Sequence, residues 1–175
     1  MTVYGGEGPL RPSVLVLGIG NRLKGDDAVG PYIASLLSES QGNQVVAPGD
    51  FTIVALDCGT VPENYTGIVR RVRPYHLVLV DAADMGLEAG AVRIVPVDMI
   101  GSLGLSTHSM PLSMFISYVA DIAGRTTLIG IQPEGMQLGA DLSDDVAIAA
   151  RCLAARLAEG RLSGIATLGD DPTRR

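Results

Sequence analysis

Short apolar runs alternate along the chain with stretches of helical periodicity. The runs have the length of β-strands and lie at residues 14–17, 51–56, 77–80, 92–97 and 127–131. The first and third, VLVL and LVLV, contain no polar residue, which is typical of parallel strands buried on both faces. In the fourth run, the alternation of Val92, Ile94 and Pro96 indicates an edge strand.

The stretches between these runs have the spacing of amphipathic helices. They lie at residues 32–37, 63–73, 112–122 and 144–159. Pro31 fits the first of them if it lies in the first turn, Pro74 stops the second, and Ser143 is expected to cap the last, which Gly160 ends. Strands alternating with helices predict an α/β fold: a three-layer sandwich whose twisted, mostly parallel sheet has about five strands, with helices on both faces.

Composition limits the possible organisation of the chain. With 175 residues, of which 47% are hydrophobic and 18% charged, the chain is expected to form a single folded domain, which we assign to residues 1–160. Residues 161–175 are polar and are expected to form a mobile tail. The first residues have neither the charged start nor the apolar core of a signal peptide.

Charge and cysteine content exclude several classes of partner. The net charge is −6 and Lys24 is the single lysine, so nucleic-acid binding is not expected. No apolar run reaches the length of a membrane span, and no membrane partner is expected. Two cysteines, Cys58 and Cys152, are too few for a disulfide framework and suit a reducing cytoplasm.

The first strand leads into a glycine turn, GIGNRLKGDDAVGP, at residues 18–31. The dinucleotide-binding pattern fails here because Leu23 stands at the third glycine position. A P-loop fails because Asp26 and Asp27 replace its Lys and Ser/Thr, and carboxylates repel phosphate. Acids at the start of a helix are also typical caps. The turn therefore presents its acids either to the helix end or to a cation.

Further acidic residues follow the other predicted strands. In a parallel sheet, ligands lie beyond the carboxyl ends of the strands, so these residues are expected to meet at one edge. The candidates are Asp26, Asp27, Asp57, Asp81, Asp84 and His108. His76 precedes its strand and is expected at the opposite edge.

These residues differ in how well they suit a catalytic or metal-binding role. Asp81 ends an apolar strand, and burying its carboxylate requires a compensating cation or hydrogen-bond donors. Asp84 reads as a turn residue, Asp26 as a cap, and Cys58 as a small core residue rather than a nucleophile. Two carboxylates and one imidazole with open positions suit a divalent ion such as zinc, nickel or iron. No HExxH or GxSxG motif is present.

Five segments together resemble one family. They are GIGNRLKGDDAVGP (18–31), DCGTVPEN (57–64), LVLVDAADMGLEAGAVR (77–93), STHSMPL (106–112) and LIGIQPE (128–134). In this order they resemble the NiFe-hydrogenase maturation endopeptidases, most closely the branch that processes hydrogenase 3-type large subunits.

The resemblance implies a nickel-dependent, aspartic-type endopeptidase. Such an enzyme removes the C-terminal extension of a hydrogenase large-subunit precursor after nickel insertion. Carried over, Asp27, Asp81 and His108 are the metal ligands and the catalytic residues. Nickel arrives with the substrate, so the resting enzyme is expected to be metal-free, and a monomer is favoured. Nickel either polarises the scissile carbonyl or serves only for recognition, with Asp27 or Asp81 as general base.

The sequence departs from the family pattern at one position and leaves two alternative functions open. Relatives commonly have Asp-Gly-Gly-Thr where this chain has Cys58 as the second residue, which changes the rim of the site. A non-catalytic metal-binding adaptor that escorts the precursor would use the same ligands. A small-molecule hydrolase on the same sheet is the third possibility.

Overall fold

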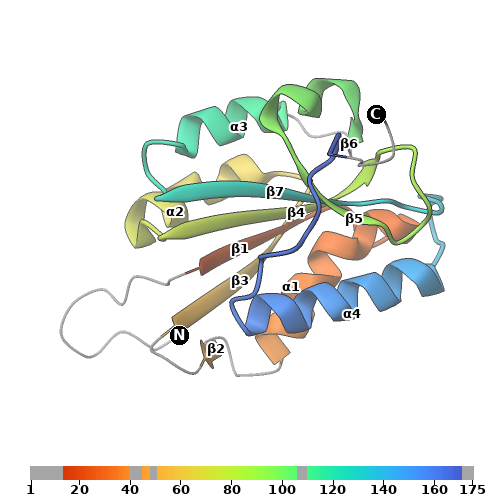
Figure 1. Ribbon diagram of the computed structural model, residues 1–175, viewed down its shortest axis with the longest axis horizontal. Coiled ribbons are helices and arrows are strands. Elements are labelled where there is room, and N and C mark those ends of the chain that lie inside the picture. Colours follow the sequence, from red (N-terminus) through yellow and green to blue (C-terminus); the bar gives the residue numbers. More distant parts are fainter. Residues whose placement is uncertain (1–13, 40–44, 48–50, 106–109, 171–175) are drawn as a thin grey trace.

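A twisted sheet forms the centre of the computed structural model, which describes residues 14–39, 45–47, 51–105 and 110–170 (Figure 1). Four strands run parallel, in the order β3 (Phe51–Gly59), β1 (Val14–Ile19), β4 (His76–Asp84) and β7 (Arg125–Ile131). Antiparallel β5 (Val92–Val95) pairs with β7 at the edge. Two short strands, β2 (Val45–Ala47) and β6 (Gly104–Leu105), pair antiparallel with β3 and β4. The predicted, mostly parallel α/β sheet is confirmed.

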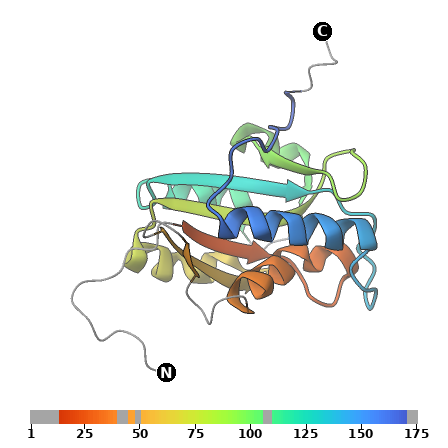
Figure 2. The ribbon, with the colours of Figure 1, turned by 60° about the horizontal axis from the view of Figure 1, so that its bottom comes forward.

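Helices cover both faces of the sheet (Figures 1 and 2). Helices α1 (Val29–Glu39) and α4 (Asp144–Ala158) lie on one face, and α2 (Thr66–Val72) and α3 (Leu112–Val119) on the other. Single turns of 3-10 helix, η1 (Gly25–Ala28) and η2 (Pro62–Tyr65), precede α1 and α2, and η3 (Val97–Ser102) follows β5. Pro31 lies in the first turn of α1, as predicted. None of the described helices is long and apolar enough to cross a membrane.

The two faces explain why β1 has no polar position. Val14 and Val16 pack against the α1 and α4 side, whereas Leu15, Leu17 and Ile19 pack against the α2 and α3 side. Successive side chains of a strand point to opposite faces, so a strand covered on both sides must be apolar throughout.

Strand β5 runs in the direction opposite to that of the parallel strands. The sequence predicts that the segment after it leaves from the same edge as the segments after the parallel strands. That prediction is wrong because β5 is antiparallel: Val92 pairs with Ile131 and Val95 with Leu128. The chain returns to the carboxyl edge of the sheet only through η3 and β6, where Leu105 pairs with Ala83.

Residues 166–168 lie alongside β5. The Ile94 amide donates to Ala166 O at 3.0 Å, and the Leu168 amide donates to Ile94 O at 2.8 Å. Arg156 Nη2 donates to Ser163 O at 2.6 Å. This stretch therefore covers part of an edge strand, whose free amides and carbonyls would otherwise be open to pairing. The assignment of residues 161–175 to a mobile tail outside the domain stays a prediction.

Close backbone packing sets α1 against the ends of β1 and β4. A Cβ atom at Gly30 would lie 2.3 Å from Ile19 O and 2.6 Å from Val80 O, and one at Gly18 would lie 2.1 Å from Gly30 O. Gly20 has φ 138°, a conformation that favours glycine, and turns the chain out of the strand. Gly18 thus allows close approach of the helix, while Gly20 makes the turn.

This packing predicts that Gly30→Ala destabilises the protein by about 3 kcal/mol or more, because rigid backbone atoms cannot move away from the new methyl group. The matched control is Gly67→Ala in α2, where an added Cβ meets nothing within 4 Å. The control should be neutral or slightly stabilising. Urea unfolding measures both; a Gly30→Ala protein as stable as the control would contradict the packing.

His76 begins β4 at the amino edge of the sheet, opposite the carboxyl ends, as predicted. Its imidazole is buried, with Nε2 2.8 Å from Thr127 Oγ1. Burial, with a smaller contribution from the Arg125 charge, lowers the pKa of His76 from 6.5 to about 4. The residue is therefore a neutral, hydrogen-bonded core histidine at neutral pH.

The lowered pKa of His76 predicts acid sensitivity. The unfolded chain takes up the proton near pH 6.5 and the folded protein only near pH 4, so folding stability falls as the pH drops through this window. In His76→Gln this contribution is absent. Between pH 7 and pH 4 the unmodified protein should lose on the order of 1–3 kcal/mol more stability than the variant. Urea unfolding across this range tests it, and parallel pH profiles would contradict it.

Candidate functional site

The carboxyl edge of the parallel strands gathers the acids that the sequence predicts there. Asp27 lies in η1, at the end of the turn that follows β1, and Asp81 lies within β4, where it pairs with Gly130. Their exposed fractions are 2% and 0%. Asp57 lies near the end of β3, where it pairs with Gly18 of β1. The topology therefore brings acids from three adjacent strands to one edge.

One carboxylate oxygen of Asp27 stands out. Its Oδ2 accepts a hydrogen bond from the Asn21 amide at 3.1 Å. Its Oδ1 is buried and has no hydrogen-bond partner among the residues that the structure describes. A buried carboxylate oxygen without a donor is costly, and a cation would compensate it. This side chain therefore fits the role of a metal ligand.

Asp81 lies on the sheet face that α2 and α3 cover, because it continues the alternation of Leu77 and Leu79. The same face holds Met110 and Leu112, which pack into this apolar cluster at the start of α3. His108 lies outside the described residues. Within the described part of the chain, no group of three His, Cys, Asp or Glu side chains is arranged to hold a metal ion.

The Asp26 carboxylate joins two loops. It is 1% exposed and accepts hydrogen bonds from the amides of Glu134 (2.8 Å), Gly135 (3.0 Å) and Ser143 (2.7 Å), and from Ser143 Oγ (3.0 Å). Ser143 is the N-cap residue of α4, but its hydroxyl makes no capping bond of its own. Asp26 thus fastens the start of α4 to η1.

The prediction that Asp26 caps its own helix is wrong. No side chain caps η1. The amide of Asp26 donates instead to Gly135 O at 2.9 Å, and that of Gly25 donates to Ala140 O at 3.2 Å. Carbonyl oxygens of the loop between β7 and α4 thus accept hydrogen bonds from both amides. Amides of the same loop donate to the Asp26 carboxylate.

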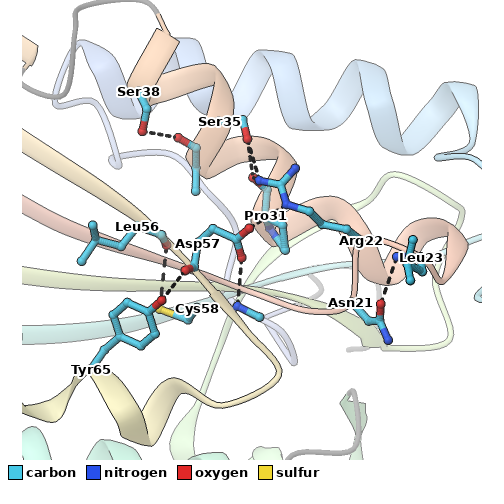
Figure 3. Close-up of polar contacts among 12 residues, drawn as sticks. Asn21, Arg22, Leu23, Pro31, Ser35, Ser38, Leu56, Asp57, Cys58 and Tyr65 are labelled. Atoms are coloured by element: carbon cyan, nitrogen blue, oxygen red, sulfur yellow. Dashed lines mark hydrogen bonds and ion pairs between the residues drawn. The ribbon is translucent and has the colours of Figure 1, made fainter.

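Asp57 is held by Arg22 at the rim of the site (Figure 3). Arg22 Nε lies 2.6 Å from Asp57 Oδ2, and its Nη2 donates to Ser35 Oγ at 2.8 Å and to Pro31 O at 3.2 Å. The Gly59 amide donates to Asp57 Oδ1 at 2.9 Å. Asp57 therefore organises the loop after β3. Sequence reasoning missed Arg22, although it stands in the loop after the strand next to that of Asp57.

Cys58 points into the core. Its replacement of the glycine that relatives commonly have therefore does not place a side chain on the rim of the site. Its side chain is buried, and the positive φ of this loop falls at Gly59 (54°). Burial, with the neighbouring Asp57 carboxylate, raises the pKa of the thiol well above its usual range, so it stays protonated and is a poor nucleophile. Tyr65 donates its hydroxyl to Asp57 O at 2.7 Å, and burial raises its pKa too.

Asp84 is a turn residue, as predicted. Its Oδ1 accepts from the Gly86 amide at 3.3 Å and from Gln132 Nε2 at 3.1 Å. Gln132 Oε1 accepts from the amides of Met85 at 2.7 Å and Leu87 at 3.2 Å. The buried Gln132, to which the sequence assigned no role, therefore fixes the loop after β4 to the end of β7.

Sequence comparison identifies hydrogenase maturation proteases as relatives of this chain. The sequence model described as hydrogenase maturation protease matches residues 37–159. A putative hydrogenase maturation protease of Methanocaldococcus jannaschii is 35% identical over 122 residues, and the hydrogenase 3 maturation protease of Escherichia coli K12 is 37% identical over 122; each match covers 69% of this chain and 72% of the relative.

A solved structure agrees with these relatives. The crystal structure of a hydrogenase 3 maturation protease superposes with a TM-score of 0.76 at 30% identity, covering 91% of this chain and 98% of that one. The family model spans most of the chain, and the fold matches over nearly all of it. The chain therefore belongs to the hydrogenase maturation protease family.

Proposed function

We propose that this protein is the endopeptidase that removes the C-terminal extension of a NiFe-hydrogenase large-subunit precursor once nickel is in place. The observation that carries the proposal is the buried Oδ1 of Asp27, which has no partner among the described residues and lies at the same sheet edge as the fully buried Asp81. Family membership supplies the reaction class and the substrate class.

In this proposal, Asp27, Asp81 and His108 contact the nickel ion that the precursor brings. Carboxylates with an imidazole and open positions suit a divalent ion of this kind. The described flanks of the His108 segment support the assignment. Before it, Leu105 pairs with Ala83, two residues beyond Asp81; after it, Met110 packs on the face of β4 that Asp81 shares.

The chain's own groups supply the proton transfers. Water adds to the scissile carbonyl carbon, and its proton passes to a carboxylate oxygen of Asp27 or Asp81. The same proton then moves to the leaving amide nitrogen as the C–N bond breaks. Asp26 cannot take this role because four hydrogen bonds from the loop before α4 occupy its carboxylate. We assign the recognition of the loaded precursor to nickel and the proton transfers to the side chains of the protein.

The proposed setting is the cytoplasm, where the protein acts as a monomer and is metal-free at rest. Both cysteines of the chain are free, with Cys58 buried and Cys152 exposed. Free thiols suit a reducing compartment.

This proposal predicts that the purified protein trims a nickel-loaded precursor and leaves a nickel-free one intact, as measured by mass spectrometry. Asp27→Asn and Asp81→Asn should each lower the cleavage rate at least about 100-fold, because each removes a charged ligand or base. Asp84→Asn is the matched control, since its oxygen serves a turn, and it should stay near wild type.

Three outcomes would contradict the proposal. Equal trimming of both precursors would exclude nickel recognition. A stable complex without any loss of mass would indicate the adaptor function. Turnover of small amides or esters, with no action on the precursor, would indicate a small-molecule hydrolase.

A further inference from the structure

Three leucines are exposed on the loops around the carboxyl edge. Leu23, Leu87 and Leu138 have exposed fractions of 69%, 36% and 79%. They lie on the loops that follow β1, β4 and β7, three adjacent strands of the sheet. We call these three side chains the leucine rim. Apolar side chains that are exposed on loops around a candidate site are candidates for an interaction surface.

Hydrogen bonds fix two of these loops to each other. The Gly139 amide donates to Leu23 O at 2.7 Å, and the Gly25 amide donates to Ala140 O at 3.2 Å. The four bonds to the Asp26 carboxylate connect the same two loops. Leu23 and Leu138 are therefore exposed on backbone that is held in place.

Gln132 holds the third loop. Its Oε1 accepts from the Leu87 amide at 3.2 Å, and its carbonyl oxygen accepts from the Gly90 amide at 2.9 Å. The loop after β4 is thus fastened to the end of β7, from which the Leu138 loop continues. The leucine rim is a preorganised surface, which lowers the entropy cost of binding.

We propose that the leucine rim docks an apolar surface of the folded hydrogenase precursor next to the scissile segment. The inference rests on the proposed function. The position of the rim favours this occupant: Leu23 lies four residues before Asp27 in the same turn, so a protein that brings its chain to Asp27 comes close to Leu23. In this proposal the rim binds the precursor, while the acids act on the bond.

The test is the double variant Leu23→Ser/Leu138→Ser, assayed on nickel-loaded precursor for both binding and cleavage. Because both side chains are exposed, the fold should be unaffected. KM and the dissociation constant should rise about 10-fold or more, with kcat changed less than about 2-fold. The matched control is Val97→Ser/Ile148→Ser, which removes apolar side chains that are exposed outside these loops and should leave both constants unchanged.

The outcomes separate this inference from the proposed function. If wild type cleaves the precursor and the double variant keeps the wild-type KM, the rim inference is wrong and the proposed function stands. If wild type binds without cleaving, the dissociation constant still tests the rim. Absence of both binding and cleavage would overturn both. A wild-type dimer that the double variant splits, with unchanged KM, would assign the rim to a second copy of this chain.

Discussion

The carboxylate of Asp26 is the interaction on which the carboxyl edge depends. It is buried and accepts four hydrogen bonds from residues more than a hundred positions later in the chain. Bonds to an ionised acceptor are among the stronger ones in proteins, and losing a partner inside the protein is costly. Through them η1, the loop after β7 and the start of α4 form one unit. Asp27 belongs to that unit, and Leu23 is joined to it because its carbonyl oxygen accepts a hydrogen bond from the Gly139 amide.

The acids at this edge divide into structural and chemical groups according to their partners. Asp26 is fully engaged by the loop before α4, and Asp57 by Arg22 and the Gly59 amide. Asp84 accepts hydrogen bonds in a turn. Asp27 instead keeps one buried oxygen without a partner among the described residues. Adjacent, identical side chains thus serve different purposes because donors engage both oxygens of Asp26 but only one oxygen of Asp27 among the described residues.

The layers of the fold and the carboxyl edge of the sheet can be predicted from the sequence because strands that are buried on both faces are apolar throughout. The apolar runs of β1 and β4 accordingly have no polar position. The direction of β5 cannot be predicted in this way, since alternation is the same in parallel and antiparallel strands. The partners of Asp26 and the pairing of Arg22 with Asp57 are contacts between distant segments, which local patterns do not contain. The burial of the Cys58 side chain is likewise not contained in the local pattern.

Hydrogen exchange of Asp26→Ala tests most directly whether this carboxylate holds the site together. The Gly135 and Ser143 amides, which bond Asp26, and the Asn21 amide, which bonds Asp27, should exchange roughly 10- to 100-fold faster than in wild type. In Asp26→Ala, the Leu79 amide in the central strand β4 should keep its wild-type exchange rate. In the control variant Asp84→Ala, all amides outside the turn of Asp84 should keep their wild-type exchange rates. An Asn21 amide that keeps its wild-type rate in Asp26→Ala would contradict the account, because Asp27 would then be positioned without Asp26.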